Sequence, residues 1–219
     1  MTPRRSGCRS ALVTLLSRSN ATPDEPLVVI ATPRLVLSLP SAAAAARYLA
    51  YFDDNRAHLE PWEPTREAGF YTPAFWRARI EKNRREYVTD QSMRLALTLG
   101  TDPDGPVVGQ VNFNNFVRGA FQAATLGYSL DHRHVGQGYM HEALRWSIPW
   151  VVRRLGMHRI MANYIPTNER SGRLLRRLGF VVEGYARDYL RISGTWRDHV
   201  LTALTAPVPW EGELEREPL

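Results

Sequence analysis

The segment from Arg133 to Gly138 combines one arginine with two closely spaced glycines, Gly136 and Gly138. Glycine lets the backbone turn tightly and lets a ligand approach closely. A helix that begins at this point offers unpaired N–H groups and a positive dipole end, which favour phosphate oxygens. The segment therefore predicts a pyrophosphate-binding loop, although a plain strand-to-helix turn can carry the same glycines. No Gly-Lys-Ser/Thr follows, and the third glycine of the dinucleotide fingerprint is missing.

The histidines and the single cysteine do not indicate a metal site. No pair of histidines has the spacing of a metalloprotease helix, and no acidic partner motif accompanies them. The six are His58, His132, His134, His141, His158 and His199. Cys8 stands alone, so an intrachain disulfide and a cysteine-based zinc site are excluded, and a reducing cytoplasm is the expected compartment.

The elements that would position the loop follow from local patterns. Ser41 and Thr72-Pro73 are typical helix starts, and Gly179 is a typical helix stop. Residues 93–99 alternate as a half-buried strand does. The expected strands begin at Leu35 and cover 93–99, 107–117, 123–130, 158–165, 180–185 and 196–205. The expected helices are 41–53, one after Thr72, 137–155 and 168–178, and residues 55–71 are expected to form a loop around Trp62.

Strands and helices are interspersed, with a meander in the middle, which predicts an α+β fold around one mixed sheet. One domain is expected at 27–206, between a disordered extension at 1–26 and an acidic flexible tail at 207–219. The net charge is +6. The tail carries four glutamates and one arginine, so the rest of the chain carries about +9. Such an excess favours a polyanionic ligand or nucleic acid, and a solvated basic surface would explain it equally well.

Several motifs together resemble one enzyme family. Arg133-x-x-Gly136-x-Gly138 after the fourth strand is similar to the coenzyme-binding motif of the GNAT N-acetyltransferases. The second half of the chain, with Asn168-x-Arg170-Ser171 and the segment 196–204, is similar to the ribosomal-protein alanine N-acetyltransferases within that family. Residues 55–64 and 112–119 fit the same group. The resemblance covers about residues 32–207 and leaves both tails unexplained.

The resemblance implies a GNAT fold, with a mixed, mostly antiparallel sheet of about seven strands flanked by about four helices. It also implies acetyl-CoA as cosubstrate and no metal. The residues expected to contact the coenzyme are Leu130, Arg133, Val135, Gly136, Gln137, Gly138, Tyr139, Met140, Asn168 and Ser171. Asn168 can also simply cap its helix.

The implied reaction is direct attack of a free amine in a ternary complex, without a covalent enzyme intermediate. Asp188 is the expected general base by resemblance. Glu142 is the other candidate, although an acidic residue in a first helical turn is favoured by the dipole alone. Ser171 is the expected acid, with Tyr164 and Tyr185 as alternatives. A backbone N–H near Leu130, where relatives have a bulge, would hold the oxyanion.

The acceptor implied by the resemblance is the N-terminal alanine of a small-subunit ribosomal protein. Its expected contacts are Trp62, Asn112, Tyr164 and Tyr185, although Trp62 can equally be a plug beneath a loop. A basic surface would help docking near ribosomal RNA on the small subunit, and no membrane partner is expected. Two alternatives stay open: a small amine such as an antibiotic or amino acid, and a ribosome-assembly factor with incidental acetylase activity.

Overall fold

A computed structural model describes residues 25–206 of the chain. The acidic tail expected at 207–219 and nearly all of the extension expected at 1–26 lie outside this range. Eight strands form one sheet in the order β1-β2-β3-β4-β5-β6-β8-β7, in which only β5 and β6 run parallel. The strands are β1 Val28–Ala31, β2 Leu35–Leu39, β3 Met93–Leu99, β4 Val107–Val117, β5 Ala123–Leu130, β6 Arg159–Tyr164, β7 Val181–Ile192 and β8 Thr195–Thr205.

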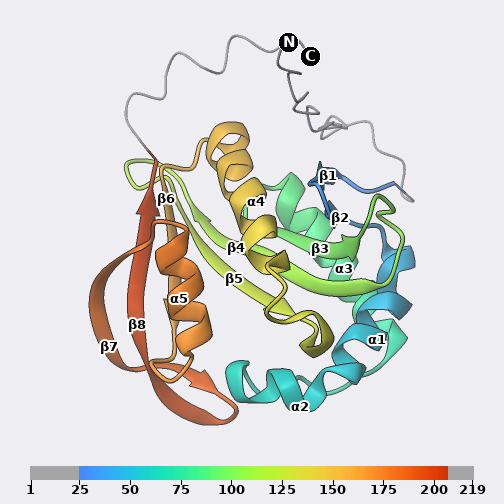
Figure 1. The fold of residues 1–219 in the computed structure, drawn as a ribbon. Coiled ribbons are helices and arrows are strands. Elements are labelled where there is room, and N and C mark those ends of the chain that lie inside the picture. The colour runs from blue at the N-terminus through green and yellow to red at the C-terminus, as the bar shows by residue number, and fades with distance from the viewer. Residues whose placement is uncertain (1–24, 207–219) are drawn as a thin grey trace, which may run out of the picture.

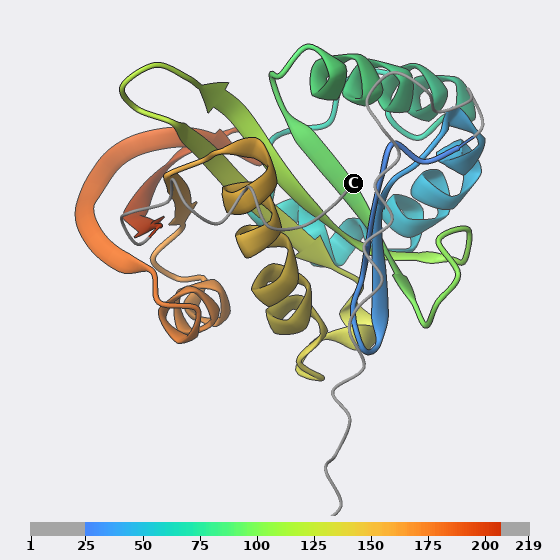
Figure 2. The same ribbon diagram turned by 90° about the horizontal axis from the view of Figure 1, so that it is seen from above.

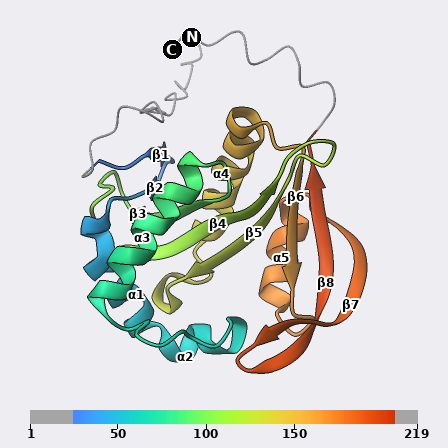
Figure 3. The same cartoon turned by 180° about the vertical axis from the view of Figure 1, so that it is seen from behind.

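Helices cover both faces of this sheet. The α-helices are α1 Ala45–Asp54, α2 Arg56–Leu59, α3 Pro73–Val88, α4 Tyr139–Leu155 and α5 Glu169–Arg177. Short 3-10 turns are η1 Ala42–Ala44, η2 Glu60–Trp62 and η3 His132–His134. In Figure 1, α4 and α5 lie in front of the sheet, and Figure 3 shows α1 and α3 on the opposite face. Seen from above in Figure 2, the β7–β8 hairpin curls away from the plane of the other strands.

The two faces have separate cores. Aliphatic side chains of the sheet pack with α4 in one cluster, and aromatic side chains of α1 and α3 form the other. Tyr48, Phe52 and Trp76 stack at its centre, with Trp76 ring centroids 5.1 Å from Tyr48 and 4.6 Å from Phe52. Burial on both faces explains why β3 is not half-buried as expected: Ala96 and Thr98, on the face predicted to be solvated, are as buried as Leu95.

The local helix signals are confirmed, and the longer segments differ from expectation. The side chains of Ser41 and Thr72 accept hydrogen bonds from the Ala43 and Phe75 N–H groups. The expected loop at 55–71 contains α2 and η2, and β1 pairs with β2 as an additional edge strand. β7 and β8 are longer than predicted because they continue into a tight turn at Ser193 and Gly194.

No helix among residues 25–206 is both long and apolar enough to span a membrane.

Candidate active site

A wedge opens in the middle of the sheet, between β5 and β6. The two strands pair only through residues 123–125 of β5, and β5 then continues to Leu130 without β6 beside it. On its other edge β5 stays paired with β4 as far as Gly109 and Leu130. No register shift occurs near Leu130, since the irregularity in this pair lies between Asn114 and Val117. β5 and β6 therefore separate while the register between β4 and β5 stays regular near Leu130.

Backbone groups of β5 point into this wedge. The Asp131 N–H donates to the Val108 carbonyl at 2.8 Å, so Leu130 and Gly109 form a non-hydrogen-bonded pair of the antiparallel ladder. The N–H and C=O of Leu130 consequently face away from β4, as do those of Tyr128 two residues earlier. The wedge thus offers donors and acceptors to an extended ligand with amide groups and places the Leu130 N–H where an oxyanion can accept from it.

The glycine loop leads from the end of β5 into α4. Gly136 and Gly138 have φ angles of 84° and 81°, in the left-handed region that glycine adopts without strain. Gly138 is the N-cap residue of α4, and no protein atom lies within 4 Å of a Cβ placed on Gly136. Helix α4 begins at Tyr139, two residues later than predicted, and its first intrahelical bond runs from the Glu142 N–H to the Gly138 carbonyl. The free N–H groups of its first turn suit phosphate oxygens.

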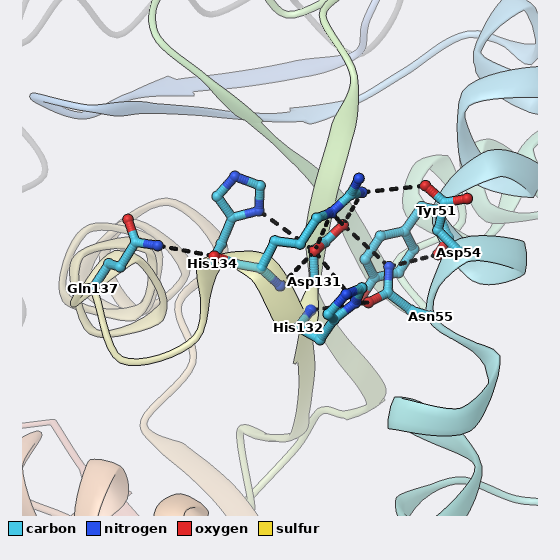
Figure 4. A network of polar contacts seen from close by, with 8 residues as sticks. Tyr51, Asp54, Asn55, Asp131, His132, His134 and Gln137 are labelled. Carbon is cyan, nitrogen blue, oxygen red and sulfur yellow. Dashed lines mark hydrogen bonds and ion pairs between the residues drawn. The ribbon is translucent and has the colours of Figure 1, made fainter.

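Asp131 anchors the start of this loop (Figure 4). Its buried carboxylate accepts from the Arg133 N–H at 2.8 Å and the Arg133 guanidinium at 2.6 Å, and from the Asn55 amide at 3.2 Å. Asn55 also accepts from the His132 N–H at 2.9 Å. Burial alone would raise the pKa of Asp131, but the hydrogen bonds from Arg133 and Asn55 hold it well below its usual range. The network fixes the loop against the end of α1.

Arg133 is therefore engaged on the α1 side of the loop. Its guanidinium contacts Asp131 and, at 3.2 Å, Asp54 of α1, and the bond to Asp131 raises the pKa of Arg133. Other positive groups act on the first turn of α4. Burial lowers the pKa of His141 there, and Arg177 and Arg145 lower it further.

The remaining expected coenzyme contacts surround the loop. Val135 is extended and half-buried, the Gln137 amide donates to the Arg133 carbonyl at 2.9 Å, and Met140 is buried in the core. Arg34, which the sequence did not single out, lies 4.5 Å above the Tyr139 ring and donates to the Gln137 carbonyl.

Glu142 is bound by neighbours from the β1–β2 turn. Its carboxylate accepts from the Thr32 hydroxyl at 2.7 Å, the Arg34 N–H at 2.8 Å and the Arg34 guanidinium at 2.6 Å. Burial favours a raised pKa, but these hydrogen bonds outweigh it and keep the pKa of Glu142 below its usual value. Such a carboxylate is well suited to holding the turn against α4 and poorly suited to accepting a proton.

Ser171 lies on the α5 side of the wedge. Its hydroxyl is 2.8 Å from the hydroxyl of Tyr128, and its N–H donates to the Asn168 side chain at 3.2 Å, which confirms the predicted cap. Burial raises the pKa of Tyr128 to about 12, partly offset by the hydrogen bond with Ser171. The paired hydroxyls make a relay that can deliver a proton into the wedge.

Asp188 lies on an irregularity of β7, between residues 186 and 190. It is exposed, has a φ of 47°, and its N–H donates to Asp198 at 2.9 Å. Within residues 25–206, neither Arg187 nor Arg191 pairs with it. Asp198 also accepts from the Tyr185 hydroxyl at 2.6 Å, and these two hydrogen bonds lower its pKa. Asp198 is not among the catalytic or binding residues expected from the sequence.

A cavity of about 410 Å³ lies between η2 and the β7–β8 turn. The Ser193 N–H donates to the Glu63 carbonyl at 2.9 Å and holds the turn over it. Its lining residues are Glu60, Pro61, Trp62, Thr167, Ile192, Ser193, Thr195 and Arg197. Trp62 is thus a wall of a cavity, and it is more exposed than a plug beneath a loop would be.

The other expected acceptor contacts lie elsewhere. Tyr164 of β6 and Tyr185 of β7 are both paired with Val200 of β8, so their side chains point to the same face of the sheet. Tyr164 lies against Gly172 of α5, which identifies this face as the one that α5 covers. Asn112 lines a separate pocket of about 220 Å³ between the sheet, α1 and α3, and its side-chain oxygen is buried without a hydrogen-bond partner within the described range.

In the part of the chain that the structure describes, no group of three or more histidine, cysteine or acidic side chains is arranged to hold a metal ion.

Sequence reasoning missed Asp131, Tyr128 and Arg34. Asp131 carried a signal, because an aspartate directly after a strand and before a glycine loop is a typical turn residue. Tyr128 belongs to an alternating strand, and nothing local shows that β6 departs beside it. Arg34 contacts Glu142 across 108 positions of sequence, and no local pattern predicts such a pair.

The wedge and the glycine loop at the start of α4 both lie within the part of the chain that matches a known family. The acetyltransferase (GNAT) domain family matches residues 34–181, and the chain belongs to this family of acyltransferases.

Among its relatives, the chain is 46% identical over 183 residues to the ribosomal protein uS5-alanine N-acetyltransferase of Escherichia coli, covering 83% of this chain and 93% of the relative. It is 34% identical to the probable N-acetyltransferase YjcK of Bacillus subtilis, covering 74% and 89%. The crystal structure of the ribosomal-protein-S5-alanine acetyltransferase of Vibrio fischeri superposes with a TM-score of 0.76 at 36% identity, covering 81% and 96%. Mycobacterium smegmatis RimJ in complex with CoA-disulfide superposes with a TM-score of 0.75 at 29% identity, covering 81% and 87%.

Proposed function

We propose that this protein transfers the acetyl group of acetyl-CoA to the N-terminal α-amine of a ribosomal protein, with an N-terminal alanine of the small subunit as acceptor. The observation that carries the proposal is the wedge between β5 and β6, with the glycine loop at one end and the Trp62 cavity near its opening. The 46% identity to an enzyme that modifies such an alanine supports the acceptor. A reaction on ribosomal proteins would take place in the cytoplasm.

The residues present fit coenzyme A. The Gly136–Gly138 loop and the first turn of α4 would hold the pyrophosphate, and no side chain fills the space beside Gly136. The backbone N–H and C=O of Tyr128 would hold the amides of the pantetheine arm. Bound acetyl-CoA supplies the activated acetyl thioester.

The chain's own groups then perform distinct steps. The Leu130 N–H donates to the carbonyl oxygen as negative charge develops on it. The Ser171 hydroxyl, backed by Tyr128, protonates the departing sulfur. The acceptor α-amine has an ordinary pKa of about 7.7–8.0, so a good share is already neutral near pH 7–8 and attacks directly without a covalent enzyme intermediate.

The cavity walled by Trp62 would receive the acceptor's N-terminus. Its volume lies in the range of about 300–1,000 Å³ typical of sites for small ligands. Two segments that are distant in sequence, η2 and the β7–β8 turn, form walls of the cavity. Its shape therefore depends on the hydrogen bond between Ser193 and Glu63 that joins them. A Trp62→Ala variant is expected to raise the KM for the peptide and to leave the Kd for acetyl-CoA unchanged.

The direct test is acetylation of synthetic peptides. The full chain is incubated with acetyl-CoA and peptides that begin with Ala, Ser or Met, and thiol release is followed together with peptide mass. We expect the Ala peptide to gain about 42 Da at its N-terminus, because one acetyl group replaces one hydrogen of the amine. Acetylation of a small amine such as an amino acid, with every peptide inert, would overturn the ribosomal-protein acceptor. Binding to small subunits with no acetylation of any amine would instead support an assembly factor.

A further inference from the structure

The turn between β1 and β2 lies against the glycine loop where the loop enters α4. Figure 2 shows this turn beside the segment that precedes the helix. The turn is fixed at both of its sides. The Thr32 N–H donates to the Leu35 carbonyl at 2.8 Å, and the Gly100 N–H donates to the Arg34 carbonyl at 2.9 Å. Arg34 therefore reaches the loop from a backbone that is already held in place.

The Arg34 guanidinium contacts the end of the loop and the start of α4. Its Nη1 donates to the Gln137 carbonyl at 3.0 Å, and its Nε donates to the Glu142 carboxylate at 2.6 Å. Its central carbon lies 4.5 Å from the centre of the Tyr139 ring. Its Nη2 lies 3.4 Å from a Cβ placed on Gly138. One side chain thus holds the last turn of the loop against the first turn of the helix.

The hydrogen bond to Gln137 determines how one peptide unit of the loop is oriented. In a trans peptide the C=O and the N–H of the next residue point in opposite directions. Because Arg34 holds the Gln137 carbonyl, the Gly138 N–H points to the opposite side of the loop. Within the described residues this N–H has no hydrogen-bond acceptor. It is therefore a further free donor next to the N–H groups of the first turn of α4, which suit phosphate oxygens.

Arg133 and Arg34 hold opposite ends of the loop. Arg133 is bonded to Asp131 at the start of the loop, at 2.6 Å. Arg34 is held by Glu142, whose side chain is 13% exposed, whereas that of Arg34 is 46% exposed. An arginine side chain that is half in solvent has many rotamers, and the buried carboxylate selects one of them. Glu142 thus orients Arg34 toward the Gln137 carbonyl.

We propose that Arg34 is a positioning residue for the pyrophosphate of the coenzyme, because it turns the Gln137–Gly138 peptide so that the Gly138 N–H faces the phosphates. This inference rests on the proposed function. Arg34 acts through the loop and contacts neither the acetyl group nor the acceptor amine. It therefore determines how tightly a donor with a pyrophosphate binds, and it leaves the rate of acetyl transfer unchanged.

The first experiment measures the Kd for coenzyme A by calorimetry and kcat at saturating acetyl-CoA. Arg34→Gln should raise the Kd about tenfold, which corresponds to the loss of about one hydrogen bond. The kcat should stay within about twofold of the wild type. An unchanged Kd, or a loss of kcat as large as the loss of affinity, would overturn the assignment.

Arg47→Gln is the matched control. Arg47 likewise donates to two loop carbonyls, those of Pro103 and Gly105, and pairs with the carboxylate of Asp104. This loop joins β3 to β4 and is separate from the glycine loop. The Kd for coenzyme A should therefore be the same in Arg47→Gln as in the wild type. An equal rise in both variants would mean that the loss of any such arginine weakens binding, and the assignment to Arg34 would fail.

A donor without phosphates separates a positioning role from general support of the site. S-acetylpantetheine carries the same thioester and pantetheine arm as acetyl-CoA but has no pyrophosphate. Its kcat/KM should be the same in Arg34→Gln and in the wild type, whereas kcat/KM for acetyl-CoA should fall. A similar fall with both donors would overturn the proposal, because it would mean that Arg34 supports the whole site.

Glu142→Gln tests whether Glu142 acts through Arg34. The Kd for coenzyme A should rise in this variant, and the double variant should bind no more weakly than Arg34→Gln alone. Additive losses would refute the orienting role of Glu142. A wild type that binds no coenzyme A would refute the proposed function itself. A wild type that binds coenzyme A no more tightly than Arg34→Gln would refute only the role of Arg34.

Discussion

Replacing Asp131 by asparagine tests whether the loop anchor stabilises the fold through its charge. Every hydrogen-bond partner of the Asp131 carboxylate is a donor: the Arg133 N–H, the Arg133 guanidinium and the Asn55 amide. An asparagine keeps one acceptor oxygen and turns its own NH₂ group toward donors. Hydrogen bonds to a charged group contribute about 1.5–3 kcal/mol. The Arg133 side chain is 57% exposed, and solvent weakens its hydrogen bonds to Asp131. We therefore expect Asp131→Asn to lower the free energy of unfolding by about 2 kcal/mol.

The assay is urea unfolding of both proteins from pH 8 to pH 3.5, with Asp104→Asn as control. Asp104 pairs with Arg47, but the Asp104 side chain is 82% exposed. Asp104→Asn should therefore lower the free energy of unfolding by less than about 1 kcal/mol. Since the folded state lowers the pKa of Asp131, its contribution is complete above the unfolded value of about 3.9 and is lost as the pH falls below it. The difference in unfolding free energy between wild type and Asp131→Asn should thus shrink below about pH 4. An unchanged difference at pH 3.5, or a loss no larger than that of Asp104→Asn, would refute the reasoning.

Three further changes have definite outcomes. Gly136→Asp should lower the affinity for acetyl-CoA at least tenfold in calorimetry. Gly119→Asp is the control, because Gly119 also has a positive φ and open space around it but lies at the other end of β5, and this variant should keep its affinity. Equal affinities of the two variants would mean that the glycine loop does not bind the coenzyme. Ser171→Ala should lower kcat with little change in the Kd for acetyl-CoA, and a wild-type rate across the pH range would exclude it as the acid. Gly172→Ala places a Cβ 2.8 Å from the Tyr164 ring, so thermal unfolding should show a loss of about 1–3 kcal/mol, and an unchanged Tm would mean that the ring shifts freely.

The sequence predicted those features that depend on a few adjacent residues. The caps at Ser41, Thr72 and Asn168 need only one side chain and the next turn of helix, and all three form. Gly136 and Gly138 adopt the left-handed angles that their spacing suggested. The contact between Arg133 and Asp54 could not be predicted in this way, because Asp54 lies 79 positions away in the sequence. The burial of β3 on both faces could not be predicted either, because it depends on α1, α3 and α4, which are distant from β3 in the sequence.

The site depends on a departure from regular pairing, which sequence patterns do not report. Residues 123–130 read as one continuous strand, yet β6 pairs with only the first three of them. The opening connects the two faces of the sheet. Ser129 contacts Tyr51 of α1 on one face, while Tyr128 contacts Ser171 of α5 on the other.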